Sequence, residues 1–298
     1  MSSLDWERDG RSWPNRQHSR FIEADGLNFH YQQMGERPVI LLLHGTGAST
    51  HSWHGVMPSL ARRFAVIAPD LPLHAFTGGE PVSRRTAMPG MVRALAALLD
   101  ALKIRPAAIA GHSAGAAIAL EMARTGVVAE TAPIIGFNPA LTPFPGAAAQ
   151  VFPGLAKLLL LNPFVPKIFS GLSRFAGDPE RFLERSTGSR TDPVSLRCYT
   201  ALFANSHHTR GALAMMAHWD LETFSKNLDQ IANPVQLIHS RGDLAVPLGS
   251  VEGAAARLPN ARLDVWDDLG HLAHEEAPER AAQAIADFVS EQVQGAST

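Results

Sequence analysis

Residues 107–115 read Ala-Ala-Ile-Ala-Gly-His-Ser-Ala-Gly, and the last five, Gly111-His112-Ser113-Ala114-Gly115, decide the fold. This G-x-S-x-G pattern follows an apolar run and precedes a helix-forming stretch, which is the strand–turn–helix setting of a nucleophile elbow. Small residues let the strand and the helix approach closely while the serine hydroxyl projects from a strained turn. The alternative is a glycine-rich turn with an incidental serine, and the flanking strand and helix argue against it.

Apolar runs alternate with helix-forming stretches on both sides of this elbow. The Asp25-Gly26 pair between residues 20–23 and 27–33 predicts a β-hairpin. Continuous apolar runs predict strands buried on both faces at residues 39–43, 65–68 and 107–110. Three further strands are expected at residues 132–137, 235–239 and 262–266. Helices are expected at residues 53–62, 88–102, 114–124, 250–258 and 278–293. The alternation predicts an α/β fold with a mostly parallel central sheet flanked by helices.

The alternation is interrupted between the sixth and the seventh predicted strand. About 95 residues lie there, and a connection of that length needs structure of its own. We therefore expect a helical lid at residues 141–232, inserted between two parts of a core, residues 1–140 and 233–298. Residues 1–19 are polar and predict a loosely held arm.

The predicted lid contains two strongly apolar stretches, residues 151–161 and 164–169. They favour either an apolar substrate gate or peripheral contact with a membrane surface. Plain packing of lid helices on the core is the alternative, since apolar helices must bury their side chains somewhere.

A serine nucleophile needs a base, because a hydroxyl is weakly reactive until its proton is removed. After an elbow serine, the chain order is an acid and then a histidine. Asp243 follows the strand predicted at residues 235–239, and His271 follows the last predicted strand. Three nearby residues compete for these two roles: His274, Asp267 and Asp268. The order favours a catalytic triad of Ser113, Asp243 and His271.

The loop His44-Gly45-Thr46-Gly47 directly follows the strand predicted at residues 39–43. Such a loop supplies the second amide donor of an oxyanion hole, and the first comes from the residue after the nucleophile. We predict that the amides of Thr46 and Ala114 form this hole. Seven apolar residues are candidates for substrate binding, although a residue of this kind more often belongs to the core: Trp53, Phe137, Phe144, Phe203, Met215, Met216 and Trp219.

The composition limits the class of protein. The formal net charge is -2, from 26 basic and 28 acidic residues, so binding of nucleic acid through phosphates is not expected. The single cysteine, Cys198, excludes an intramolecular disulfide and a cysteine-rich metal site. No metal-ligand spacing and no G-x-G-x-x-G motif occurs, so no metal or cofactor is expected. A charged N-terminus and the lack of long apolar runs predict a cytoplasmic protein.

From residue 20 to residue 293 the chain resembles an α/β-hydrolase. Haloalkane dehalogenases and epoxide hydrolases carry aspartate at the elbow centre, where this chain has Ser113. Three motifs resemble more closely the magnesium-chelatase accessory hydrolases of bacteriochlorophyll biosynthesis: HGTGASTHSW at residues 44–53, APDLP at 68–72 and GHSAGAAIAL at 111–120. This resemblance implies a tetrapyrrole pathway, and magnesium chelatase as a partner.

The sequence departs from that family at one turn. The family's usual Asp-Leu-Pro-Gly-His-Gly is Asp70-Leu-Pro-Leu73-His74-Ala75 here. Left-handed backbone angles cost more when a residue has a side chain, so the backbone of this turn is in question.

The leading hypothesis is a serine hydrolase that cleaves an apolar carboxylic ester through an acyl-enzyme. A fold can host unrelated functions, so a porphyrin-binding accessory protein for magnesium chelatase, without turnover, is a second hypothesis. A third keeps the triad in an acyltransferase or a carbon–carbon bond hydrolase.

Overall fold

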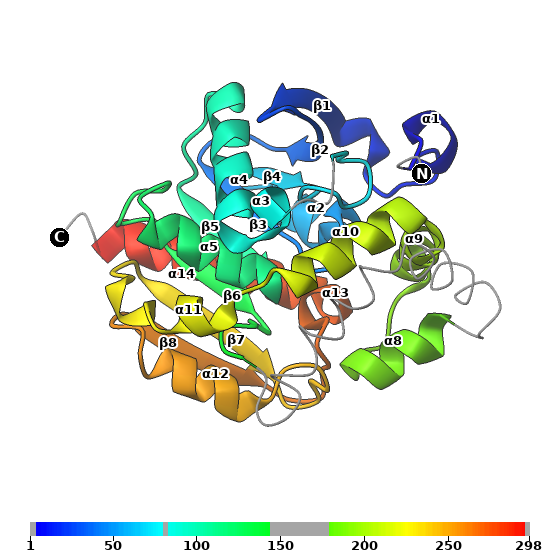
Figure 1. Ribbon diagram of the computed structural model, residues 1–298. Coiled ribbons are helices and arrows are strands. Elements are labelled where there is room, and N and C mark those ends of the chain that lie inside the picture. Colours follow the sequence, from blue (N-terminus) through cyan, green and yellow to red (C-terminus); the bar gives the residue numbers. More distant parts are fainter. Residues whose placement is uncertain (1–3, 80–82, 144–178, 296–298) are drawn as a thin grey trace.

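A single eight-stranded sheet organises the chain in a computed structural model that describes residues 4–79, 83–143 and 179–295. Its order is β1-β2-β4-β3-β5-β6-β7-β8 (Figure 1). The strands are β1 Ser19–Ala24, β2 Leu27–Met34, β3 Val39–Leu43, β4 Ala65–Pro69, β5 Ala108–His112, β6 Ile134–Phe137, β7 Val235–Ser240 and β8 Ala261–Trp266. β1 and β2 form the predicted hairpin, β2 pairs antiparallel with β4, and all later pairs are parallel. The predicted α/β fold is confirmed.

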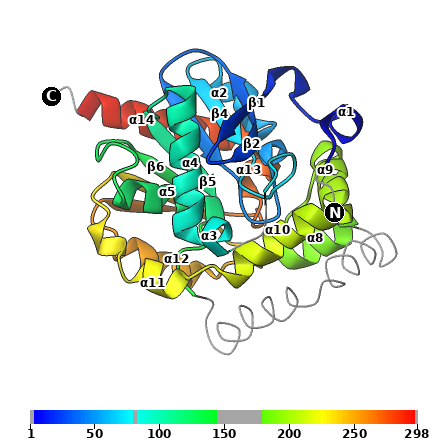
Figure 2. The same ribbon diagram turned by 45° about the horizontal axis from the view of Figure 1, so that its top comes forward.

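Helices cover both faces of this sheet, as Figures 1 and 2 show. The first face carries α4 Met88–Leu102, α5 Ala114–Arg124, α11 Leu221–Ser225 and α12 Leu248–Ala255. The second carries α2 Val56–Leu60, α13 Ala273–Glu276 and α14 Pro278–Gly295. β3 is apolar throughout because both of its faces are covered. Leu41 and Leu43 pack on the first face, and Ile40 and Leu42 pack on the second.

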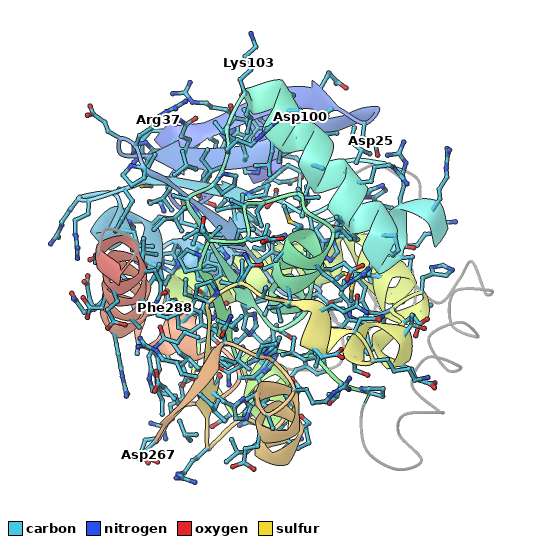
Figure 3. The ribbon with its side chains drawn as sticks, turned by 90° about the vertical axis from the view of Figure 1, so that its left-hand side faces the viewer. Asp25, Arg37, Asp100, Lys103, Asp267 and Phe288 are labelled. Carbon is cyan, nitrogen blue, oxygen red and sulfur yellow. The ribbon has the colours of Figure 1, made fainter. Side chains whose placement is uncertain are left out.

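Phe288 on α14 is buried against the second face of the sheet, whereas the exposed residues Arg37, Asp100 and Lys103 lie at the periphery of the molecule (Figure 3). Three further short helical segments lie between these elements: η2 Thr50–Trp53, α3 Ser83–Thr86 and η3 Leu228–Gln230. Because strands β3 to β8 run parallel, their carboxyl ends and the loops that follow them lie along one edge of the sheet.

The N-terminal segment is packed, so the expected loose arm at residues 1–19 is wrong for residues 4–18. They form α1 Trp6–Asp9 and η1 Arg16–His18. Trp13 is buried, and its Nε1 donates a hydrogen bond to Thr50 Oγ1 at 3.2 Å. The polar composition concealed large apolar anchors, since Leu4 and Trp13 share a cluster with Phe76.

Four helices of the long connection between β6 and β7 are described: α8 Pro179–Thr187, α9 Pro193–Ala204, α10 Ser206–Ala217 and α11. Phe144 and both strongly apolar stretches, residues 151–161 and 164–169, lie outside the described residues. The division of the chain into core and lid at residues 141 and 232, and contact of this region with a membrane, stay predictions. Within the described part of the chain, no helix has the length and apolar character that crossing a membrane requires.

The turn that lacks the family's glycines still has a left-handed backbone. Leu73 has φ +64° and Ala75 has φ +44°. The Ala75 amide donates to His208 Nδ1 on α10 at 3.0 Å. Gly211, one turn further along α10, lies against Leu73 so closely that a Cβ there would clash with the Leu73 backbone. Leu73 and Ala75 thus pack against α10 in a left-handed backbone conformation, which costs about 1–2 kcal/mol at each non-glycine residue.

Candidate active site

Ser113 stands at the turn between β5 and α5 in a strained conformation. Its φ is +50° and its ψ is -115°, outside the regions that residues with a side chain prefer. A Cβ on Gly111 would clash with the backbone of residues 115 and 116, and a Cβ on Gly115 would clash with the Leu43 carbonyl. Both glycines of the motif are therefore required by close backbone approach, which lets the serine project beyond the sheet.

Asp243 and His271 form a hydrogen-bonded acid–base pair beside the elbow. Asp243 lies after β7, His271 lies after β8, and His271 Nδ1 donates to Asp243 Oδ2 at 2.8 Å. Because Nδ1 holds the proton in this bond, neutral His271 keeps Nε2 as an acceptor. That is the tautomer in which an imidazole can take a proton from a serine hydroxyl.

The Asp243 carboxylate is buried but well supplied with donors. The amides of Ala245 and Val246 donate to Oδ1 at 2.7 and 2.8 Å, and Asn138 Nδ2 donates to Oδ2 at 2.9 Å. Burial alone would raise its pKa, but the hydrogen bond and charge interaction with His271, together with these donors, hold the pKa below its usual value. The acid therefore stays ionised at neutral pH.

The competing residues have other environments. His274 is fully buried against Trp53 and His112, and burial lowers its pKa well below the usual value. Asp267 pairs with Arg241 at 2.7 Å and points out from the edge of the molecule (Figure 3). Asp268 occupies a left-handed turn, with φ +59°. Of the candidate acids and bases, only Asp243 and His271 bond to each other within the part of the chain that the structure describes.

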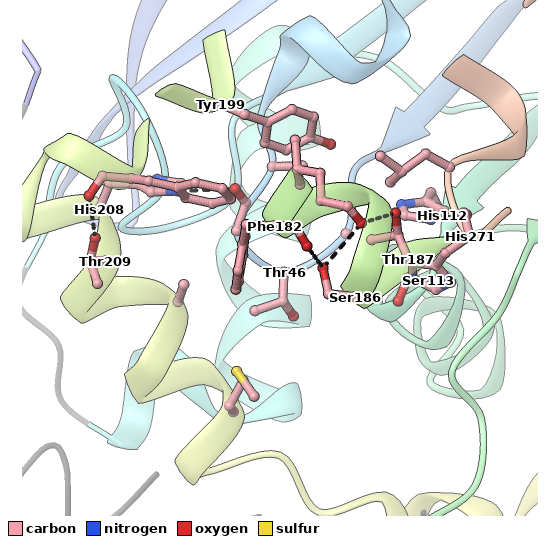
Figure 4. Close-up of a pocket in the computed structure, with 18 of the residues that line it drawn as sticks. Thr46, His112, Ser113, Phe182, Ser186, Thr187, Tyr199, His208, Thr209 and His271 are labelled. Carbon is pink, nitrogen blue, oxygen red and sulfur yellow. Dashed lines mark hydrogen bonds between the residues drawn. The ribbon is translucent and has the colours of Figure 1, made fainter. Parts of the chain in front are cut away.

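A cavity of about 440 Å³ opens above the elbow (Figure 4). Its walls come from the loop after β3, the elbow, the loop after β8 and helices α8, α9 and α10. The described residues that line it are Gly45, Thr46, Gly47, Ala48, His112, Ser113, Phe182, Leu183, Ser186, Thr187, Tyr199, Phe203, His208, Thr209, Ala212, Leu213, Met216, His271 and Leu272. None of these carries a carboxylate, an ammonium or a guanidinium group.

Ser113 and His271 share one wall of this cavity (Figure 4). Among the described residues, Ser113 Oγ has no hydrogen-bond partner, so a serine–histidine hydrogen bond is not formed. Catalytic hydrogen bonds of this kind are often long without substrate and shorten in the complex. His112 helps to place the base, because its Nε2–H donates to the His271 carbonyl at 2.9 Å.

The two predicted oxyanion-hole residues flank Ser113 from different elements. Ala114 is the first residue of α5, so its amide N–H has no acceptor within the helix. Thr46 lines the cavity in the turn closed by the Ala48 amide and the Gly45 carbonyl, at 3.2 Å. Gly45 lies so close to Ser113 that a Cβ there would press on the serine Cβ.

His208 connects this turn to the one at Ala75. Its Nδ1 accepts from the Ala75 amide, so the proton resides on Nε2, which donates to the Gly47 carbonyl at 3.1 Å. Burial lowers the pKa of His208 to about 4, and the ring is therefore neutral.

Four of the predicted substrate-binding residues lie elsewhere, and their prediction is wrong for this cavity. Trp53 and Phe137 are fully buried on the second face of the sheet, and neither lines the cavity. Met215 and Trp219 pack on the first face, whereas Phe203 and Met216, which were also candidates, line the cavity. An apolar side chain near a catalytic loop suits the core as well as a pocket, so residue type alone did not show which of the two it would face.

Sequence reasoning missed Asn138, which holds the acid. The residue directly follows β6, next to β7 in the sheet, and carboxyl ends of neighbouring parallel strands meet at one edge. A polar residue at that position was the available signal. Thr187, Ser189 and Glu276, which contact the histidine loop, carried no comparable signal.

The chain belongs to the α/β-hydrolase family, because the family's sequence profile, described as alpha/beta hydrolase fold, matches residues 38–278. It is 38% identical over 282 residues to the magnesium-chelatase 30 kDa subunit of Rhodobacter capsulatus, covering 93% of this chain and 96% of the relative. It is also 33% identical over 266 residues to the pimeloyl-[acyl-carrier protein] methyl ester esterase of Aromatoleum aromaticum, covering 85% of this chain and 98% of the relative.

Solved structures confirm the fold. An esterase of Thermogutta terrifontis superposes with a TM-score of 0.70 at 20% identity, covering 92% of this chain and 98% of that chain. The epoxide hydrolase CorEH superposes with a TM-score of 0.73 at 20% identity, with the same coverage. The expected resemblance to α/β-hydrolases, including a magnesium-chelatase subunit, is confirmed.

Proposed function

We propose that this α/β-hydrolase cleaves an uncharged, largely apolar carboxylic ester through an acyl-enzyme. The observation that carries the proposal is the His271–Asp243 pair, bonded at 2.8 Å, whose histidine lines the same cavity as the strained Ser113. With Nδ1 bonded to Asp243, His271 leaves Nε2 as the acceptor that serine chemistry requires.

In the first half-reaction, Ser113 Oγ attacks the ester carbonyl carbon and its proton passes to His271 Nε2. The oxyanion accepts hydrogen bonds from the amides of Thr46 and Ala114, and one such donor is worth about 3–4 kcal/mol in the transition state. His271 then gives the proton to the leaving alkoxide, the ester C–O bond breaks, and the alcohol departs.

In the second half-reaction, water attacks the acyl carbon while His271 Nε2 takes one of its protons. The acyl–serine bond breaks, Ser113 Oγ regains a proton from His271, and the carboxylic acid leaves. Asp243 stays ionised and stabilises the imidazolium in both halves, in agreement with the lowered pKa of this acid.

The cavity supports the substrate class. Its described lining contains no formal charge, and a charged group would lose hydration there without gaining a partner. The esterase name of one relative supports ester chemistry. The chelatase-subunit name of the other supports a setting in tetrapyrrole metabolism, with magnesium chelatase as the partner.

The test is turnover of p-nitrophenyl butyrate by the wild type, by Ser113→Ala and by Ser225→Ala. The first substitution should abolish burst and turnover, because it removes the nucleophile. The second removes a serine of α11 whose hydroxyl bonds to the Glu222 carbonyl, outside the cavity lining, and should leave both unchanged. Equal turnover by wild type and Ser113→Ala would refute the proposal.

The relative's chelatase name favours one second candidate, a porphyrin-holding accessory protein without turnover. Fluorescence titration with protoporphyrin distinguishes the two. Tight binding by a protein that hydrolyses no ester of a chain-length series would support the second candidate and reject the first.

A further inference from the structure

The segment at residues 187–190 joins the end of α8 to the loops that carry both the catalytic acid and the base. α8 ends at Thr187, and the Gly188 amide closes its last turn on the Glu184 carbonyl at 2.8 Å. Gly188 has φ +73°, the left-handed conformation that ends many helices. The chain therefore leaves α8 in a defined direction, toward the loops after β7 and β8.

The segment at residues 187–190 accepts two hydrogen bonds from the loop that carries His271, one from the His271 amide and one from the amide of the next residue. The His271 amide donates to the Thr187 carbonyl at 2.8 Å. The Leu272 amide donates to Ser189 Oγ at 2.8 Å, and Ser189 is buried. Both acceptors thus fix the backbone at and immediately after the residue whose imidazole moves the proton.

Glu276 of α13 adds a third connection. One carboxylate oxygen, Oε2, accepts from the Arg190 amide at 3.0 Å, and the other, Oε1, accepts from the Gly270 amide at 2.8 Å. A single carboxylate thereby bridges the segment at residues 187–190 to the residue just before His271.

The acid loop lies against the same segment. A Cβ on Gly188 would clash with the Gly242 carbonyl, and a Cβ on Gly270 would clash with Gly188 and Ser189. The Leu244 amide also faces the Thr187 carbonyl, at 3.4 Å. These contacts touch the residues on both sides of Asp243, so the segment bears on both members of the 2.8 Å pair.

From this geometry we infer that residues 187–190 are a positioning element that sets the alignment of His271 with Asp243, and that Ser189 and Glu276 are positioning residues of the active site. The inference rests on the proposed ester hydrolysis. Phe182, Leu183 and Ser186 of α8 line the cavity, so a substrate that packs on α8 also acts on the element that places the base.

The test compares Ser189→Ala and Glu276→Gln with Ser225→Ala, the matched control in which a buried serine loses one hydrogen bond outside the cavity lining. With p-nitrophenyl butyrate, each of the first two should lower kcat roughly tenfold with KM nearly unchanged. Each should also shift the acid limb of the kcat/KM pH profile, because His271 changes its distance to Asp243. Purely structural damage would lower the thermal midpoint without moving that limb.

A second readout does not depend on turnover. The His271 Nδ1 proton shared with Asp243 should give a downfield proton NMR resonance at low pH, which Ser189→Ala and Glu276→Gln should shift or broaden and Ser225→Ala should not. If the wild type hydrolyses no ester but the resonance responds, ester hydrolysis fails and the positioning element stands. If both variants keep the wild-type resonance, pH profile and kcat, the positioning element is refuted whatever the substrate. Glu276 is only partly buried, so its variant provides the test even if Ser189→Ala does not fold.

Discussion

Replacing the buried Glu275 by glutamine should stabilise the protein strongly at pH 8 and little at pH 5. Glu275 lies on α13, and its Oε1 accepts a hydrogen bond from the Tyr199 hydroxyl of α9 at 2.7 Å. Oε2 has no hydrogen-bond partner among the described residues. Burial raises the pKa of this carboxyl to about 8, and the Tyr199 hydrogen bond offsets only part of the rise. The neighbouring His274 supplies no positive charge, since burial lowers its pKa well below the usual value.

The sign follows from comparing the folded and the unfolded chain. The unfolded carboxyl ionises above its ordinary pKa of 4.5, whereas the folded one stays protonated until about pH 8. Between these two pH values, ionisation stabilises the unfolded state but not the folded state. The free energy of unfolding therefore falls as pH rises. At about 1.36 kcal/mol per pKa unit, the full loss above pH 8 is about 5 kcal/mol, and about 3–4 kcal/mol of it arises between pH 5 and pH 8.

Urea unfolding, followed by tryptophan fluorescence at pH 5 and at pH 8, measures this pH dependence of the free energy of unfolding directly. The free energy of unfolding of Glu275→Gln minus that of the wild type should grow by several kcal/mol between pH 5 and pH 8. Any pH-independent cost of the new amide cancels in that comparison. Glu291→Gln, which removes an exposed pair with Arg262, should change stability by less than about 1 kcal/mol at either pH. An equal effect of Glu275→Gln at both pH values would refute a protonated, buried Glu275.

Three further outcomes are expected. In thermal unfolding, Ala75→Gly should stabilise the protein by roughly 0.5–1 kcal/mol, because it removes the strain of a left-handed alanine. Leu73→Gly should destabilise the protein, because losing a buried leucine side chain costs about 2 kcal/mol or more. Burial raises the pKa of the Cys198 thiol to about 12, so iodoacetamide should label it in urea and not in the native protein; rapid native labelling would contradict this. The wild type should prefer p-nitrophenyl butyrate over the p-nitrophenyl monoester of succinate by kcat/KM at least tenfold, and equal values would contradict an uncharged cavity.

Strands and helices of the core were predictable because their signals are local. A strand buried on both faces is apolar at nearly every position, so residues 39–43 and 65–68 could be recognised without knowing their partners. The N-terminal segment shows the limit of such reasoning. Its polar composition predicted a loose arm, yet Trp13 is buried through contacts with Thr50 and Phe76, far along the chain.

For the site, chain order and the elbow motif indicated the acid and the base, because parallel strands deliver the loops that follow them to one edge. The pocket was less predictable. Trp53 and Met216 were both apolar candidates for substrate binding, but Trp53 is fully buried in the core and Met216 lines the cavity. Which way a side chain points depends on the orientation of its helix against the sheet, and composition does not carry that information.

The amino-acid sequence by itself determined the alternating fold, the strained serine turn and the order of the reactive groups, since each follows from steric limits and apolar patterning within short stretches. Only the tertiary structure decided how those groups are held. Asn138 reaches Asp243, and the Thr187 carbonyl and the Ser189 hydroxyl reach the loop of His271, across 83 or more positions of the chain. Such contacts arise when distant segments pack and leave no periodic trace in the sequence, so their residues became visible only in three dimensions.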